Sequence, residues 1–263
     1  MDFFGCAVAV DGDVVAVGAK GAENGGAEDA GMAHVFERNE GNTNLWVWAR
    51  MLWAFDADED DHLGSAVAVA GDVVVVGAEG DSDHGYYSGS AYVFQRNAGG
   101  VNKWGQVQKL EASDGMPFDY FGSAVAADNG VILVGAYQDD APATDSGSAH
   151  LFPMQPEDWN ETKKLVASNG AADDCFGRSV AVAGDVAIVG APNVYSEGAA
   201  YIYERITGGG TNTWGQVKIL PGPPTSSDFG SSVAAAGDVV VVGARNGTGG
   251  DYNSGTAYVF ERN

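Results

Sequence analysis

The chain repeats one sixteen-residue pattern five times, and this repetition constrains the fold more than any other feature. The copy "FGSAVAADNGVILVGA" begins at Phe121, and every copy opens on an aromatic residue or leucine followed by glycine. The first residue and the glycine of the closing Gly-Ala pair are 14 positions apart in all five copies, and the copies are spaced by 59, 58, 55 and 53 residues. A constant internal length at such a period is typical of a propeller or solenoid built from one rigid unit. The copies begin at Phe4, Leu63, Phe121, Phe176 and Phe229.

The centre of each copy predicts a tight β-hairpin. In four copies a Gly-Asp pair such as Gly71-Asp72 separates two apolar runs, and glycine at the first position suits a type II′ turn. Asn129-Gly130 stands at this place in the third copy and suits a type I′ turn. We name the two predicted strands A and B. Because both are nearly continuous apolar runs, we expect both to be buried on both faces.

Two further strands complete the repeat. A loop of variable length ends in glycine and leads into strand C, as in "SGSAYVFQR", and a tryptophan opens strand D, as in "WGQVQKLEA". These tryptophans are Trp46, Trp104, Trp159 and Trp214. Four antiparallel strands covered on both faces by copies of themselves form a propeller blade. The sequence therefore predicts an all-β fold, with one β-propeller domain over residues 1–263 and approximate blades 2–60, 61–118, 119–173, 174–226 and 227–263.

The fifth copy ends on strand C, so the last of the five predicted blades lacks its outer strand. Either the ring closes with a three-stranded last blade, or the chain is a segment of a longer array. We favour the closed ring, because an open arc would expose the apolar faces of blades one and five. The unpaired edge of strand C could accept a strand from a neighbouring chain.

The charge of the chain excludes several classes of partner. Its formal net charge is −23, which would repel nucleic acid and anionic lipid surfaces. The longest apolar run is far shorter than a membrane helix needs, so no membrane insertion is expected. The only cysteines, Cys6 and Cys175, occupy non-equivalent places in their repeats and are expected to be buried free thiols rather than a disulfide.

No catalytic pattern is present, which predicts that the chain is not an enzyme. Neither a Ser-His-Asp arrangement nor a zinc, P-loop or dinucleotide motif occurs. His34 and His150 fill a position where the other copies have Tyr92, Tyr201 and Tyr258, so we expect a polar tip on a packed ring. A polysaccharide-acting enzyme that uses loop carboxylates remains an alternative.

Acidic clusters in the loops are the best candidates for a metal site. Oxygen ligands at alternate positions suit calcium, although solvated turns are the simpler interpretation. The candidate ligands are Asp56, Asp58, Asp60, Asp81, Asp83, Asp139, Asp140 and Asp145. No cofactor is certain, and calcium is possible. Asp2, Asp61, Asp119 and Asp174 recur two positions before the opening Phe or Leu, which predicts turn capping by the side chain rather than a site.

Loop aromatics are the best candidates for partner contacts, because loops carry binding on rigid scaffolds. The candidate contact residues are Tyr86, Tyr87, Tyr137, Tyr195, Asp251 and Tyr252. Trp48 and Trp53 are extra to the repeat and could form an aromatic platform, although a packing role is favoured. Asn160 and Asn246 stand in N-x-Thr sequons and are candidate glycosylation sites.

These residues resemble the FG-GAP repeat of the integrin α-chain propeller and of bacterial and algal surface proteins. The Phe-Gly and Gly-Ala pairs match the two name-giving motifs, and Gly190-Ala191-Pro192 carries the second in full. The resemblance covers essentially the whole chain. Integrin propellers have seven blades and a calcium loop between strands A and B, whereas this chain has five copies and only two residues there. We therefore do not transfer calcium binding to that position.

The resemblance implies a binding or adhesion module of an extracellular or cell-surface protein, with protein or glycan contacts through its loops. A structural subunit joined through the unpaired edge of the last blade is the main alternative.

Overall fold

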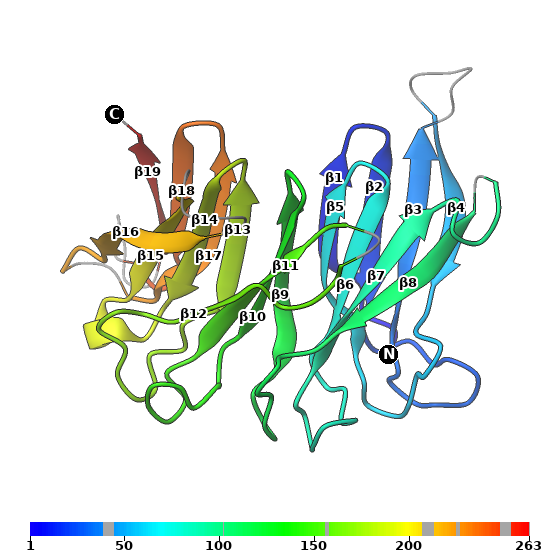
Figure 1. The fold of residues 1–263 in the computed structure, drawn as a ribbon, viewed down its shortest axis with the longest axis horizontal. Coiled ribbons are helices and arrows are strands. Elements are labelled where there is room, and N and C mark those ends of the chain that lie inside the picture. Colours follow the sequence, from blue (N-terminus) through cyan, green and yellow to red (C-terminus); the bar gives the residue numbers. More distant parts are fainter. Residues whose placement is uncertain are drawn as a thin grey trace. The chain divides into compact units, whose positions relative to one another are not determined.

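The computed structural model describes residues 1–38, 45–101, 103–155, 158–206, 213–224, 227–247 and 254–262. These residues form five antiparallel sheets, four with four strands and one with three. The only helical segment among them is a short 3-10 turn at Val194–Ser196. None of their helices is long and apolar enough to span a membrane. The predicted all-β architecture of five blades is confirmed (Figure 1).

The strands follow each other in the predicted order within each sheet. Blade one consists of β1 (Phe4–Asp11), β2 (Val14–Ala19), β3 (Met32–Arg38) and β4 (Trp46–Leu52). Blade two consists of β5 (Leu63–Ala70), β6 (Val73–Ala78), β7 (Ser90–Arg96) and β8 (Trp104–Leu110). Blade three consists of β9 (Phe121–Asp128), β10 (Val131–Ala136), β11 (Ser148–Pro153) and β12 (Lys163–Leu165). Blade four consists of β13 (Ser179–Ala183), β14 (Val186–Ala191), β15 (Ala199–Arg205) and β16 (Trp214–Pro221). Blade five consists of β17 (Phe229–Ala236), β18 (Val239–Ala244) and β19 (Thr256–Glu261).

The chain divides into two compact units, residues 1–127 and 128–263. Within the first unit β1 and β5 lie side by side, and within the second β13 lies beside β17 (Figure 1). Successive sheets of a unit therefore pack face to face. Closure of the five blades into a ring depends on how the two units are placed, and it stays a prediction.

The hairpin turns adopt the predicted conformations. Gly71 has a positive φ of 56° and Asp72 does not, as a type II′ turn requires. Asn129 and Gly130 both have positive φ, 47° and 76°, as a type I′ turn requires. Two different residue pairs thus produce the same two-residue reversal.

The repeated glycines allow neighbouring blades to approach closely. A Cβ added to Gly77, in the Gly-Ala pair of blade two, would overlap the carbonyl oxygen of Gly122, in the Phe-Gly pair of blade three. Gly18 meets Gly64 in the same way, and Gly190 meets Gly230. Only glycine fits where one backbone lies against the next. The Phe-Gly (or Leu-Gly) pair and the Gly-Ala pair of the repeat are therefore the two sides of one contact between blades.

The cores lie between successive sheets. Val35 and Leu52 of blade one pack with Phe94 and Trp104 of blade two in one buried cluster. A second cluster joins blades three and four, and a third joins blades four and five. The B strands β6, β10 and β14 are buried along their whole length, as expected.

Three expectations need correction. Strands A and B are not buried on both faces throughout. Val8 of β1 is 69% exposed and Val239 of β18 is 37% exposed, because blades one and five each have a face that no sheet of their own unit covers. Strand D of blade three is only β12 and does not begin at Trp159, because β11 ends at Pro153, which lacks an N–H to extend the ladder. The cysteines are free, but Cys6 is exposed and Cys175 half-buried rather than buried.

Candidate binding site

The junction between two successive blades forms a corner where two loops are held together by backbone hydrogen bonds. We number the corners in chain order, so that the second joins blades two and three. There the N–H of Phe118 donates to the carbonyl of Tyr86 at 2.8 Å, and the N–H of Tyr120 donates to that of Tyr87 at 3.1 Å. Gly89 and Phe121 then form a parallel bridge. The loop before β7 and the turn before β9 therefore present their side chains together.

Four aromatic rings gather at this corner. The ring centroids of Tyr86 and Tyr87 are 4.2 Å apart, and that of Phe118 lies 5.4 Å from Tyr86. Tyr120 lies 5.6 Å from Tyr87. We call these four residues, together with Met116, the aromatic corner. Tyr86, Phe118 and Met116 are 58%, 51% and 60% exposed, so the cluster is an accessible surface rather than a core.

Local sequence fixes the shape of the aromatic corner. The buried carboxylate of Asp119 accepts the N–H of Met116 at 2.7 Å and so closes the turn before β9. Ser82 Oγ accepts the N–H of Tyr87 at 3.0 Å. Pro117 lies against Gly85, where an added Cβ would come within 2.8 Å of Pro117 Cγ. The rings are thus carried on a braced backbone, which reduces the entropy lost when a partner binds.

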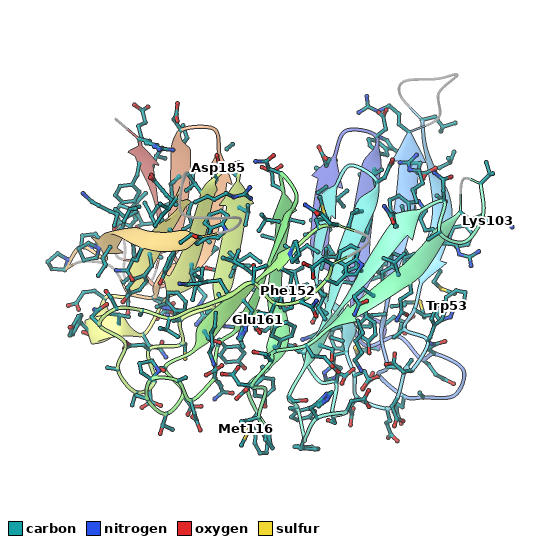
Figure 2. All side chains as sticks on the ribbon, viewed as in Figure 1. Trp53, Lys103, Met116, Phe152, Glu161 and Asp185 are labelled. Atoms are coloured by element: carbon teal, nitrogen blue, oxygen red, sulfur yellow. The ribbon has the colours of Figure 1, made fainter. Side chains whose placement is uncertain are left out.

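The aromatic corner lies at the end of its unit opposite the A–B turns, as the label of Met116 shows (Figure 2). A hydrogen bond between the side chains of Tyr86 and Tyr87, with a smaller contribution from burial, raises the pKa of Tyr87 to about 12. Burial raises the pKa of Tyr120. Both side chains therefore stay neutral over the physiological range and offer apolar faces with hydroxyl tips.

The first and third corners share this backbone but not its side chains. In the first corner, the backbone N–H of Asp60 donates to the carbonyl oxygen of Glu28, and that of His62 donates to the carbonyl oxygen of Asp29. In the third corner the equivalent donors are Asp173 and Cys175, with Thr144 and Asp145 as acceptors. The fold therefore does not require aromatic residues at this position. Their concentration in one corner is a feature of that corner alone among those described.

Three of the predicted metal ligands surround a lysine. The ammonium group of Lys109 lies 3.0 Å from Asp56, 2.8 Å from Asp81 and 2.5 Å from Asp83. Asp81 is 2% exposed and also accepts the hydroxyl of Tyr92 at 2.7 Å. The protein thus supplies its own cation at this cluster, and the arrangement is an ion-pair network.

A similar network surrounds Asp139. Its carboxylate contacts Lys164 at 2.6 Å and Ser148 Oγ at 2.8 Å, and His150 Nε2 lies 3.8 Å away. Burial alone would raise the pKa of Asp139, but the nearby His150, Lys164 and Ser148 hold that pKa well below its usual range. His150 is fully buried, and although burial opposes its charged form, Asp139 and Glu161 raise its pKa. Tyr92 and His150 thus both serve as packed rings with polar tips, as predicted.

The remaining acidic candidates are mostly engaged locally. Asp58 accepts the N–H of Glu59, and Asp140 accepts the N–H of Asp145. Asp145 itself accepts the side-chain amide of Gln138 at 3.4 Å. Within the first unit, one group of described residues has ligand atoms within 4.8 Å of one another, as a metal site requires: Asp29, Asp60 and His62.

The A–B turns cannot hold the calcium loop of the integrin-type blade, because only two residues connect each pair of strands. The predicted turn-capping aspartates are confirmed at three places. Asp61, Asp119 and Asp174 each accept the backbone N–H of the residue three positions earlier, at 2.6, 2.7 and 2.8 Å.

The other predicted contact residues lie apart from the aromatic corner in sequence. Tyr137 lies under the guanidinium of Arg178 at 4.8 Å, and Tyr195 is 77% exposed. Asp251 and Tyr252 lie outside the described residues. Of the extra tryptophans, Trp48 is 58% exposed and donates to His34, and Trp53 lies under Arg50 at 5.5 Å.

The two sequon asparagines differ in their surroundings. Asn160 is exposed and hydrogen-bonds to Asp158, whereas the amide nitrogen of half-buried Asn246 donates to Asp228 at 2.6 Å. Glycosylation of either residue stays a prediction.

Sequence reasoning found Tyr86 and Tyr87 but missed Met116, Phe118 and Tyr120. A signal was available, because Tyr120 directly precedes the repeat's Phe121, and the other four copies have Phe3, His62, Cys175 and Asp228 there. The sequence does not show that the backbone at this position is hydrogen-bonded to the loop of the preceding blade.

Comparison with protein families gives one result that covers most of the chain. The FG-GAP repeat matches at residues 1–36, 46–94, 104–152, 159–203 and 214–260. No curated protein matches the chain. Each match after the first runs from the strand D region of one sheet through strands A, B and C of the next, and the matches contain the paired glycines that join the sheets. The chain therefore belongs to the FG-GAP repeat family.

Proposed function

We propose that the chain is a non-catalytic binding and adhesion module of an extracellular or cell-surface protein. It contacts a protein or glycan partner through the aromatic corner. The observation that carries this proposal is the exposed group of four rings on a backbone that bears no phenylalanine or tyrosine at these positions in the first and third corners. Exposed aromatic side chains on a braced loop are enriched where proteins bind partners.

The chain provides its own matched control for this proposal. Replacing the aromatic residues by those of the first corner gives Tyr86→Glu, Tyr87→Asp, Phe118→Asp and Tyr120→His. The backbone tolerates these residues, since Asp29, Asp60 and His62 have positive φ angles within 7° of those of their counterparts Tyr87, Phe118 and Tyr120. The exchanged variant should therefore keep the fold while losing the aromatic surface.

Binding is tested on an array of immobilised glycans and on extracellular-matrix proteins, with the fold verified by circular dichroism. We expect the wild type to bind a defined set of spots, and the exchanged variant to lose at least tenfold in affinity, about 1.4 kcal/mol. Equal binding by both proteins would contradict a role for the aromatic corner.

A structural subunit is a second candidate function, which the open outer edge of β19 favours. Among the described residues β19 pairs only with β18, whereas the C strands of the other four blades each pair with a fourth strand.

A further inference from the structure

Three tyrosine rings of the aromatic corner lie in one row that is built from two segments of the chain. The ring centroid of Tyr87, in the middle, lies 4.2 Å from that of Tyr86 and 5.6 Å from that of Tyr120. The plane of Tyr87 is tilted by 35° from the first ring and by 31° from the second. Tyr86 and Tyr87 belong to the loop before β7, and Tyr120 belongs to the turn before β9. The row therefore brings phenol rings from two neighbouring blades close together.

The backbone holds the rings of Tyr87 and Tyr120 beside each other. The N–H of Tyr120 donates to the carbonyl oxygen of Tyr87 at 3.1 Å, and Ser82 Oγ accepts the N–H of Tyr87 at 3.0 Å. The edges of the two rings are closer than the 5.6 Å between their centroids. A reaction between groups that are already positioned is favoured over one that needs an encounter between two chains.

Half-burial distinguishes this pair from Tyr86. Tyr87 and Tyr120 are half-buried, whereas Tyr86 is 58% exposed. A radical on either half-buried ring is partly shielded from other molecules, so its nearest reactive partner is the neighbouring ring. Tyr86 and Tyr87 are consecutive in sequence, and a bond between their rings would close a small, strained cycle. The pair that spans two segments is therefore the favoured pair for coupling.

Other tyrosines of the described chain lack this combination of access and proximity. Tyr92 and Tyr203 are buried, and their hydroxyls donate to Asp81 and to the carbonyl oxygen of Val166. Tyr195 is 77% exposed but belongs to the other unit. The first and third corners have no tyrosine at the equivalent positions, so the backbone of the corner does not require one.

We propose that Tyr87 and Tyr120 form a site of oxidative modification, at which an ortho carbon of each ring joins the other in an intrachain dityrosine bond. The oxidant is hydrogen peroxide activated by a haem peroxidase, which removes one electron and one proton from each phenol. The two phenoxyl radicals couple through their ortho carbons, and each ortho proton then moves to the phenolic oxygen. The two rings lose two hydrogen atoms altogether, and the peroxide is reduced to two molecules of water.

The bond would fasten the loop of blade two to the turn before blade three. Tyr87 and Tyr120 are 33 positions apart, so the bond would constrain the unfolded chain as a disulfide closing a loop of that length does. We expect the cross-linked protein to have a Tm higher by about 5 °C. The cross-link needs no binding partner, so its failure would leave the proposed function untouched.

The experiment treats the full chain, at low protein concentration, with hydrogen peroxide and a haem peroxidase, followed by tryptic digestion and mass spectrometry. We expect monomeric protein in which the tryptic peptides 51–96 and 110–163 are linked, with a mass lower by two hydrogen atoms than their sum. Fragmentation should place the bond at Tyr87 and Tyr120. Oxidation of exposed Met116 adds oxygen and is distinguished by mass.

Phenylalanine variants assign the bond, because they keep each ring and remove only its hydroxyl. Tyr87→Phe and Tyr120→Phe should abolish the intrachain bond. Tyr86→Phe, in the same row, and Tyr195→Phe, at an exposed tyrosine of the other unit, should preserve it, with the fold of all four verified by circular dichroism. A bond that persists in Tyr120→Phe, a bond that is lost in Tyr86→Phe, cross-linking only between chains, or no cross-link in the wild type would each overturn the proposal.

Discussion

At the scale of single residues, the chain places two carboxylates of its B–C loops in the interior and compensates each with a lysine. Asp81 and Asp139 occupy equivalent places three residues after strand B, and Lys109 and Lys164 reach them from strand D. A buried carboxylate without a partner would cost several kcal/mol. The acidic loops are therefore partly structural, although their residue types suggested metal binding.

Removing one of these cations should be costly. We expect Lys109→Met to lower the free energy of unfolding by about 3 kcal/mol, because the 2%-exposed Asp81 would lose its partner. Urea denaturation measures the change. Lys103→Met is the control, since Lys103 is exposed beside the start of the same strand (Figure 2), and it should change stability by less than about 0.5 kcal/mol. Equal effects of the two substitutions would contradict the assignment.

Asp61 should make stability depend on pH. Burial raises its pKa to about 7 in the folded protein, against an ordinary value of 3.8. The folded state therefore binds the proton more tightly, so this residue's contribution decreases as pH rises from about 4 to 7, by at most about 1.4 kcal/mol per pH unit. Asp61→Asn keeps a side-chain oxygen that can accept the N–H of Asp58, and it should remove the pH dependence. Urea titration measures the free energy of unfolding of both proteins at pH 4.5 and 7. An equal change between the two pH values in wild type and Asp61→Asn would contradict the role of Asp61.

At the scale of elements, the contact between blades is a contact between glycine backbones. We expect Gly77→Ala to destabilise the protein by about 3 kcal/mol, because its Cβ would overlap the Gly122 carbonyl oxygen of the next blade. Gly115→Ala is the control, since its Cβ would meet Ala112 only at an ordinary 3.4 Å. Thermal unfolding followed by circular dichroism measures both, and a Gly77→Ala variant as stable as the control would disprove the close approach.

The elements also show what could be predicted from sequence and what could not. The A–B turns were predictable because the two residues of each turn determine its type locally, as Gly71 and Asn129 illustrate. The short β12 was not, because its length depends on Pro153 in the strand beside it. The aromatic corner was half predictable. Tyr87 and Tyr120 are 33 positions apart, and only the bonding between neighbouring blades brings them together.

At the scale of the whole molecule, the excess of acidic residues should oppose folding. The chain has 36 Asp and Glu against 13 Lys and Arg, so even complete pairing would leave 23 carboxylates without a basic partner. Repulsion among these exposed charges is screened by salt, whereas the half-buried pairs around Lys109 are screened less. We expect 0.5 M NaCl to raise Tm by about 3 °C relative to 20 mM NaCl. A lower Tm in salt would mean that surface ion pairs outweigh the repulsion.

A bound divalent cation would add to this general effect in a separable way. At matched ionic strength, calcium should raise Tm beyond the sodium value only if a site binds it in the folded state, since saturation at 100 times Kd stabilises by about 2.7 kcal/mol. The group of Asp29, Asp60 and His62 is the place to test, because no described lysine or arginine forms an ion pair with it, in contrast to Asp81. If calcium binds there, Asp60→Asn should abolish the extra shift and Asp58→Asn, two residues away, should preserve it. An extra shift that survives Asp60→Asn would exclude this group, and equal Tm values in sodium and calcium would leave the acidic corners with electrostatic and structural roles alone.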